Sequence, residues 1–229
     1  MDRIILENIT KGYNIAGRKK HKFLANILDI FSIFGNKKNL EVLKNINLQV
    51  KAGEILGIVG GNGSGKSTLL RIMAGIYRQD KGKVIINGKI ISLINLYVGL
   101  KEQLAMRDNI FLLGSLFGLS HKETSSKFNL ILEFSGLRDF LDAKIHQLSL
   151  GMAQRIVFSV AIHSNPDILL LDEVFEIGDE DFREKSVQKI KEIVKNGTSV
   201  VLVSHDIPLI EKHCNRIIHL ASGMVINNK

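Results

Sequence analysis

The sequence predicts an α/β fold in which helices cover a mostly parallel sheet and a block of helices is inserted. Three short runs, Ile55–Val59, Ile168–Leu171 and Ser199–Val203, are almost wholly apolar, as expected of strands buried on both faces of a sheet. From Val98 to Ser164 no segment has a convincing strand pattern, whereas helical periodicity recurs. The order of strands, helices and then strand–helix–strand indicates an α/β core with a helical insertion.

Each expected element rests on a local pattern. Strands are expected where β-branched and apolar runs lie between turn residues: Ile4–Asn8, Val42–Val50, Ile55–Val59, Lys83–Ile86, Lys89–Leu96, Ile168–Leu171, Ser199–Val203, Ile217–Leu220 and Met224–Ile226. Helices are expected where apolar residues recur every three or four positions: Ser67–Ala74, Met106–Phe117, His121–Ser135, Leu150–Ser164, Phe182–Lys195 and Pro208–Cys214. We expect one domain over residues 1–229, with a core of residues 1–96 and 165–229, a helical subdomain of residues 97–164 and a basic insertion at residues 14–40.

The composition is that of a globular protein. Of the 229 residues, 24% are charged and 45% are hydrophobic, which excludes wholesale disorder. The single cysteine, Cys214, excludes a disulfide framework and favours a reducing compartment. Residues 1–20 lack the apolar core of a secretory signal, and no run reaches the roughly 18 apolar residues of a membrane span. We therefore expect a soluble intracellular protein.

The formal net charge of +8 is concentrated in one stretch of the chain. Residues 14–39 contain six lysines and arginines and one aspartate. A nucleic-acid-binding face across the whole domain is therefore not indicated. Within this stretch, residues 23–34 have an amphipathic pattern at 100° per residue. A helix here either lies against lipid headgroups or a membrane partner or packs on the protein's own sheet, and the sequence leaves both open.

The eight residues from Gly60 to Ser67 match the pattern G-x-x-x-x-G-K-[ST] between a buried strand and a helix. Glycines in such a loop let backbone N–H groups converge on phosphate oxygens, and the helix N-terminus adds its positive dipole. Lys66 is expected to reach the β- and γ-phosphates and Ser67 to coordinate Mg²⁺. The alternative is a glycine-rich turn that binds nothing. A Rossmann site is excluded because no acidic residue ends the next strand, so a P-loop NTPase core of the RecA-like kind is predicted.

A second motif ends the apolar strand Ile168–Leu171 with Asp172 and Glu173. Because side chains alternate along a strand, the two acids lie on opposite sides. Asp172 is expected to hold Mg²⁺ through water, and Glu173 to deprotonate the water that attacks the γ-phosphate. His205, after the strand Ser199–Val203, is expected to contact the γ-phosphate. Taken alone, such residues are ordinary features of strand ends, and the phosphate loop makes the functional interpretation the better one.

Together these motifs resemble the ATP-binding subunit of ABC transporters over nearly the whole chain. Residues Leu148–Met152, Leu-Ser-Leu-Gly-Met, open a helix where that family has its signature, LSGGQ. The resemblance implies that Ser149, Gly151 and Met152 face the γ-phosphate of ATP held by a second copy of the chain, again through a helix N-terminus. Leu150 and Met152 replace a glycine and the glutamine of the family pattern. The alternative is an ordinary capped helix.

The resemblance also implies that Tyr13 stacks on adenine and that Asp179 belongs to a loop at the dimer interface. The structural alternatives are a packed tyrosine and a solvated turn acid. The family's Q-loop glutamine is missing, since Asn95 or Leu96 stands in its place and Gln103 lies farther along the chain. The predicted ATP-binding residues are Tyr13, Gly60, Gly61, Asn62, Gly63, Ser64, Gly65, Lys66, Ser67 and Thr68, with Lys66, Glu173 and His205 in catalytic roles and Ser67 and Asp172 as Mg²⁺ ligands.

Within the family, the sequence is most similar to ATP-binding subunits of exporters for O-antigen, capsule or teichoic acid. The Ser-x-Gly-Met signature, the run Asp172-Glu173-Val174 followed by Gly178-Asp179, and the insertion after Tyr13 carry this resemblance. It implies an ATPase that pairs with a second copy and powers export of a lipid-linked polysaccharide through a separate permease, at the cytoplasmic face of the inner membrane. The alternatives are a transporter of a drug, lipid or ion, and a soluble ABC ATPase acting on DNA or ribosomes. The latter class usually carries coiled coils or fused ATPase units, which do not fit in 229 residues.

Overall fold

The computed structural model describes residues 1–15, 38–94, 99–172 and 178–228. Its elements follow in the order β1 (Asp2–Ile15), β2 (Lys38–Lys51), β3 (Ile55–Val59), α1 (Lys66–Met73), β4 (Lys81–Ile86), β5 (Ile90–Leu93), α2 (Met106–Leu116), α3 (His121–Ser135), α4 (Leu150–His163), β6 (Ile168–Asp172), α5 (Glu180–Lys195), β7 (Ser199–Val203), α6 (Ile207–His213), β8 (Arg216–Ala221) and β9 (Met224–Asn228). The segment 23–34 lies outside the described residues, so the amphipathic helix expected there stays a prediction.

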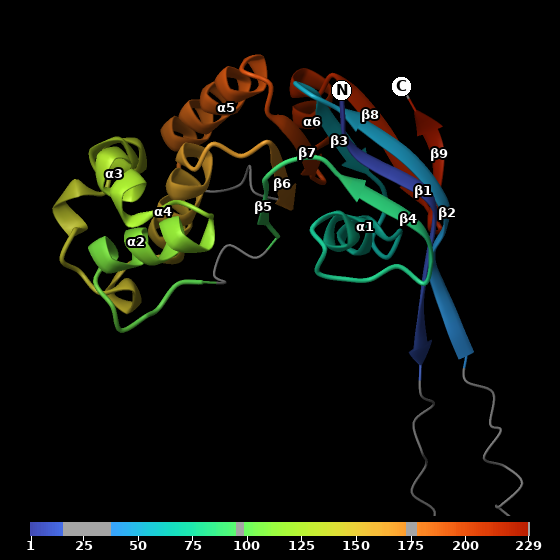
Figure 1. Ribbon diagram of the computed structural model, residues 1–229, viewed down its shortest axis with the longest axis horizontal. Coiled ribbons are helices and arrows are strands. Elements are labelled where there is room, and N and C mark those ends of the chain that lie inside the picture. The colour runs from blue at the N-terminus through green and yellow to red at the C-terminus, as the bar shows by residue number, and fades with distance from the viewer. Residues whose placement is uncertain (16–37, 95–98, 173–177, 229) are drawn as a thin grey trace, which may run out of the picture.

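Two sheets form the β part of the fold (Figure 1). One has six strands in the order β5-β6-β7-β3-β8-β9. Its first five strands run parallel, and β9 pairs antiparallel with β8. The other sheet is antiparallel, in the order β2-β1-β4. The predicted α/β class, with a mostly parallel sheet and an antiparallel part, is confirmed.

The six-stranded sheet separates two apolar layers. On β6, Leu169 and Leu171 belong to the layer shared with α2, α3, α4 and α5, whereas Ile168 and Leu170 belong to the layer shared with α1 and the antiparallel sheet. All four side chains are fully buried. A strand covered on both faces has no solvent side to keep polar, which explains why its sequence is a continuous apolar run.

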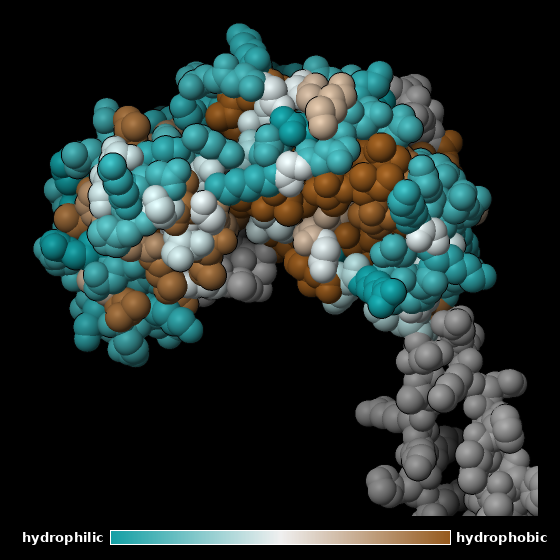
Figure 2. All heavy atoms as spheres, viewed as in Figure 1, coloured by the Kyte–Doolittle hydropathy of each residue, from teal (hydrophilic) through white to brown (hydrophobic). Residues whose placement is uncertain are grey.

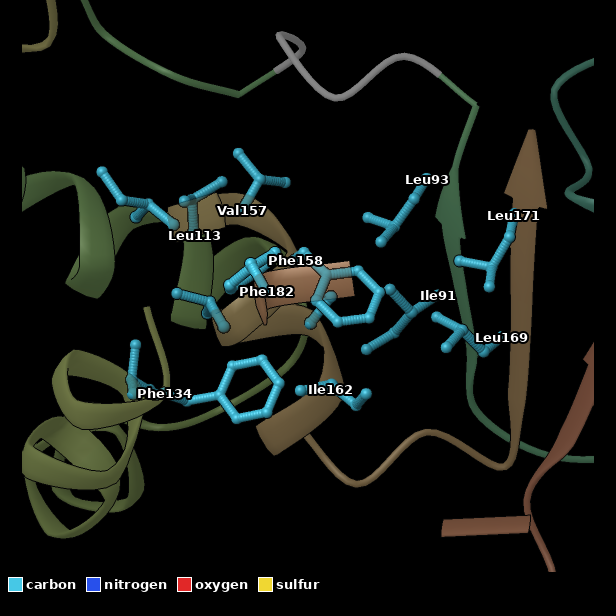
Figure 3. Close-up of a cluster of buried hydrophobic side chains, with 14 of the residues drawn as sticks. Ile91, Leu93, Leu113, Phe134, Val157, Phe158, Ile162, Leu169, Leu171 and Phe182 are labelled. Atoms are coloured by element: carbon cyan, nitrogen blue, oxygen red, sulfur yellow. The ribbon is translucent and has the colours of Figure 1, made fainter. Parts of the chain in front are cut away.

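Helices α2, α3 and α4 gather in a lobe beside the sheets (Figure 1), and α4 joins this lobe to the sheet. Figure 3 shows apolar side chains of β5 and β6 pointing toward Phe158 on α4 and Phe182 on α5. The Phe158 ring centroid lies 6.2 Å from that of Phe134 on α3 and 6.0 Å from that of Phe182. Helices α2, α3 and α4 lie within residues 97–164, and the division of the chain into a core and a helical subdomain with those limits stays a prediction.

The molecule is hollowed between the helical lobe and the sheets. Figure 2 shows hydrophobic residues gathered in the middle of this face, while most of the surrounding surface is hydrophilic. Within the described ranges, no helix combines the length and apolarity needed to cross a bilayer.

Four helices, α3, α4, α5 and α6, begin at a polar residue whose side chain caps the first turn. The side-chain oxygen of Ser149 accepts a hydrogen bond from the Met152 N–H at 3.2 Å at the start of α4. Asp179 and Asp206 cap α5 and α6 in the same way, each at 3.0 Å. Such caps satisfy N–H groups that have no partner inside the helix, so the sequence fixes where these helices begin.

The β1–β2 ribbon is longer than the sequence pattern predicts. The strands expected at Ile4–Asn8 and Val42–Val50 extend to a terminal pair between Ile15 and Lys38, and their ends project beyond the body of the protein (Figure 1). Residues 14–15 and 38–40 of the expected insertion are therefore strand. Beyond the last pair with β4, at Thr10, the ribbon has two strands only. Past Leu43, which is fully buried, no buried face imposes an apolar alternation on it.

The cysteine of this chain lies where α6 packs closely on β3. A Cβ atom at Gly57 would lie 2.6 Å from Ile210 Cγ2 and 3.0 Å from Cys214 Sγ, so only glycine allows this approach. Burial raises the pKa of the Cys214 thiol to about 12, because the thiolate is poorly solvated there.

We expect Phe158→Ala to lower the free energy of unfolding by about 3 to 5 kcal/mol, because it leaves a cavity where α3, α4 and α5 meet. Phe158 is 2% exposed. Leu130→Ala on α3 is the matched control, since Leu130 is 55% exposed, and it should change stability by no more than about 0.5 kcal/mol. Urea denaturation measures both variants, and equal effects would contradict the central role given to Phe158.

Candidate active site

The phosphate loop connects β3 to α1 in a conformation that depends on glycine. Gly65, directly before α1, has a φ of +108°, and a Cβ there would lie 2.8 Å from Leu43 Cδ2. A Cβ at Gly60 would lie 2.2 Å from the Leu220 carbonyl oxygen. Because a side chain at either position collides with its surroundings, only glycine lets the loop lie this close to β2 and β8.

A pocket of about 400 Å³ lies over this loop. It brings together most of the predicted phosphate-binding residues with a residue from the end of β7 and two from β2; its lining is Leu40, Val42, Asn62, Gly63, Ser64, Gly65, Lys66, Ser67, Thr68 and His205. The sequence predictions did not include Leu40 and Val42. Their spacing of two along β2 places them on one face of the strand, but nothing local relates that face to the loop.

Lys66 is buried, with 7% of the residue exposed. Its Nζ donates hydrogen bonds to the carbonyl oxygens of Gly60 at 2.7 Å and Gly61 at 3.1 Å. The ammonium is thus held against the loop beside the pocket. Nearby, Ser64 Oγ is buried and has no hydrogen-bond partner among the described residues. A fixed cation and a free hydroxyl on a loop of this kind suit phosphate oxygens.

The residues predicted to hold Mg²⁺ have the chemistry that this ion requires. Ser67 is half-buried at the start of α1, and Asp172 is half-buried at the C-terminal end of β6. A hydroxyl and a carboxylate are hard oxygen ligands, and Mg²⁺ is commonly held by one or two such protein groups together with phosphate oxygens and water. The residues present therefore fit Mg²⁺ bound together with a phosphorylated ligand.

His205 is exposed after β7 and lines the same pocket as Lys66 and Ser67; its expected contact with a γ-phosphate stays a prediction. Glu173, Asn95 and Leu96 lie outside the described residues, so their expected roles stay predictions. Gln103 is exposed in the segment before α2.

Tyr13 borders the pocket instead of lining it. It is 36% exposed, and its ring contacts the ring of Tyr77 edge-on, with a centroid separation of 6.3 Å. Tyr13 pairs across the ribbon with Leu40, which does line the pocket. Its expected contact with adenine stays a prediction.

The signature residues lie at the exposed N-terminus of α4, away from the phosphate-loop pocket. Ser149 is exposed, Leu150 is 57% exposed, and Met152 is half-buried. A Cβ added at Gly151 would meet no atom within 4 Å. This open surface leaves room for a ligand presented by another molecule, and the contact in trans stays a prediction.

Asp179 links the predicted dimer loop to the signature helix. Its Oδ2 lies 2.6 Å from a guanidinium nitrogen of Arg155 on α4, and Arg155 also lies over the Phe182 ring, 5.0 Å from its centroid. A Cβ at Gly178 would lie 2.9 Å from Arg155 Nε. Two hydrogen bonds hold the pKa of the Asp179 carboxyl below its usual value. The one from the Phe182 N–H has the larger effect, and the one from Arg155 has the next largest.

Comparisons with known proteins agree with this geometry. The family model described as "ABC transporter" matches residues 43–176. The chain belongs to the ABC transporter family. The teichoic acids export ATP-binding protein TagH of Lactococcus lactis is 39% identical over 97% of this chain and 47% of its own length. The O-antigen export system ATP-binding protein RfbB of Klebsiella pneumoniae is 35% identical over 94% of this chain and 88% of its own length.

Among solved structures of ABC cassettes, a dimeric ATP-binding cassette in a post-hydrolysis state, bound to ADP and Pi, has a TM-score of 0.79 and 27% sequence identity. The match covers 99% of this chain and 97% of that one. The chain spans about half the length of several curated relatives that it matches, with 47% of the Lactococcus protein and 43% of the O-antigen export system ATP-binding protein RfbB of Myxococcus xanthus.

We expect Arg155→Gln to raise the pKa of Asp179 toward its usual value but not to reach it, because the hydrogen bond from the Phe182 N–H remains. A carboxyl with a lowered folded-state pKa stabilises the fold at neutral pH, and this contribution is lost as the pH falls through that pKa. The pKa is measured from the carboxyl carbon resonance as a function of pH. Arg107→Gln is the control, since Arg107 pairs with Asp142 at a different place; an unchanged Asp179 in Arg155→Gln would contradict the role of the ion pair.

Proposed function

We propose that this chain is the ATP-hydrolysing subunit of an exporter that moves a lipid-linked cell-surface polysaccharide through a separate permease. The observation that carries the ATPase proposal is the pocket in which Lys66, Ser67 and His205 meet over a glycine-dependent loop. The cargo is inferred from relatives that export teichoic acids and O-antigen and match more than nine-tenths of this chain.

Binding of ATP would begin at the loop. The N–H groups of the loop and of the first turn of α1 surround the phosphates, and Lys66 transfers its hydrogen bonds from the Gly60 and Gly61 carbonyls to phosphate oxygens. Ser67 and Asp172 would hold Mg²⁺, which neutralises charge on the phosphates during transfer. Positioning and electrostatic stabilisation supply most of the catalysis in phosphoryl transfer, so a rigid loop is the main requirement.

Hydrolysis would use residues that follow the ends of β6 and β7. Glu173 would accept a proton from the attacking water, and His205 would donate a hydrogen bond to the γ-phosphate. The ATP would lie between the loop of one copy and Ser149 and Gly151 of the other, so each copy completes the partner's site. The exposed N-terminus of α4 supports this arrangement, as does the dimeric state of the similar cassette bound to ADP and Pi.

Closure of such a pair would move the permease. Hydrolysis would then return the pair and the permease to their starting state. The subunit would then lie at the cytoplasmic face of the inner membrane, held there by its permease. An exporter of another cargo, a drug, lipid or ion, would use the same ATPase chemistry, so the cargo needs a test of its own.

We expect Glu173→Gln to retain ATP binding and to lower steady-state hydrolysis by about 100-fold or more, because the general base is lost. In the presence of ATP the variant should then accumulate as a dimer, which size-exclusion chromatography detects. Lys66→Ala is the contrasting variant and should weaken ATP binding by roughly tenfold or more, since it removes charge-assisted hydrogen bonds. Turnover at the wild-type rate in Glu173→Gln would remove Glu173 from its role, and unchanged affinity in Lys66→Ala would contradict the phosphate site.

We expect affinity purification of the full subunit from its native membrane to bring down a polytopic permease together with a lipid-linked glycan. Mass spectrometry identifies both. A permease with a different cargo would exclude the polysaccharide, and ribosomal or DNA-associated proteins alone would exclude transport.

A further inference from the structure

The turn between α1 and β4 is attached to β1 beside Tyr13. The carboxylate of Asp80 in this turn lies 2.7 Å from Lys11 Nζ and accepts a hydrogen bond of 2.7 Å from the Gly12 N–H. The Asp80 N–H in turn donates to the Thr10 carbonyl oxygen at 2.9 Å. The turn is thus held to β1 at the three residues that precede Tyr13.

The same turn fixes Tyr77 to α1. The N–H groups of Ile76 and Tyr77 donate to the Arg71 carbonyl oxygen at 2.9 and 3.1 Å, and the Arg71 guanidinium lies over the Tyr77 ring, 5.5 Å from its centroid. Since α1 begins at Lys66, the position of the Tyr77 ring follows that of the phosphate loop.

The Tyr77 ring meets the Tyr13 ring at an interplanar angle of 73°. Edge-to-face contacts of this kind restrict both rings. Lys11 Nζ lies 5.7 Å from the Tyr13 ring centroid and is itself held by Asp80. Two neighbours therefore set the orientation of the Tyr13 ring, and both are attached to the turn after α1.

The exposed part of the Tyr13 ring belongs to the pocket side of the ribbon. Residues directly opposite each other in an antiparallel pair project their side chains to the same face. Tyr13 is opposite Leu40, and Leu40 lines the pocket over the phosphate loop. The pocket wall formed by Val42 and Leu40 continues toward Tyr13, at the end away from the loop.

We propose that Tyr77 is a positioning residue for the nucleobase of ATP. It holds the Tyr13 ring at the rim of the pocket, in a fixed position relative to the phosphate loop. The base and the phosphates of ATP are therefore bound at a fixed separation. A base stacks on an aromatic face only when that face is oriented for it. This inference rests on the proposed ATPase function and on the expected contact of Tyr13 with adenine, to which it adds Tyr77 and the turn residue Asp80 as the groups that position the Tyr13 ring.

The test compares two ligands of the full chain, MgATP and magnesium tripolyphosphate, which has the phosphates of ATP without the base. Tyr77→Leu removes the ring and keeps an apolar side chain, whereas Tyr77→Phe keeps the ring. Ile76→Ala is the matched control, since Ile76 precedes Tyr77 in the same turn and is 58% exposed. Isothermal titration calorimetry gives both affinities for each variant.

We expect Tyr77→Leu to weaken MgATP binding about three- to tenfold, which corresponds to the loss of one aromatic contact, and to leave tripolyphosphate binding unchanged. The KM for ATP should rise while kcat is retained. Tyr77→Phe should restore the wild-type affinity, and Tyr13→Leu combined with Tyr77→Leu should be no weaker than Tyr13→Leu alone.

Equal weakening of both ligands would show that the substitution acts through α1 and the phosphate loop, and would overturn the base-positioning role. An unchanged affinity for MgATP would overturn it as well. A wild-type chain that binds neither ligand would instead refute the proposed ATPase function, so the two failures are distinguishable.

Discussion

The shared edge of the parallel strands β3, β6 and β7 is the constraint on which the candidate site depends. Parallel strands present their C-terminal ends at one side of a sheet, and these three strands are neighbours. The phosphate loop follows β3, Asp172 ends β6, and His205 follows β7. Residues far apart in the chain therefore lie at one edge of the sheet, because both faces of these strands are packed, which fixes their register. The chemistry proposed here is a consequence of that packing.

Helix α4 connects the sheet that carries the phosphate loop with the exposed signature residues, which are the two regions that ATP would contact in a pair of copies. Its middle packs on the sheet through Phe158, its N-terminus exposes Ser149 and Leu150, and Arg155 between these regions holds Asp179. A movement of the helical lobe would therefore be transmitted to the signature residues and to the start of α5 together. The cap at Ser149 keeps the first turn of α4 ordered, so the surface that we propose meets a second copy is defined before any partner binds.

The sequence predicted the parts of this structure that depend on local signals. Helix α3 occupies its expected residues, His121–Ser135, because a capping box of Ser120 and Glu123 begins it and Gly136 in a left-handed conformation ends it. The phosphate loop could be predicted because strand, glycines and helix are contiguous. Non-local contacts could not be predicted: Leu40 in the pocket wall, the Arg155–Asp179 pair and the Tyr13–Tyr77 contact all join segments whose proximity only the fold decides. The full length of the β1–β2 ribbon was missed because no core imposes a pattern on its end beyond Leu43.

The burial of Cys214 has a practical chemical consequence. Burial raises the pKa of this half-buried thiol to about 12, so little of it is the reactive thiolate at neutral pH. The native chain should therefore react very slowly with maleimides and iodoacetamides while it is folded. A cysteine introduced at an exposed place, such as the tip of the helical lobe or the turn after α1, would react selectively without removal of the native one. The protein thus allows fluorophores or spin labels to be attached at single chosen sites, so that separations between the lobe and the sheets can be followed through the proposed catalytic cycle.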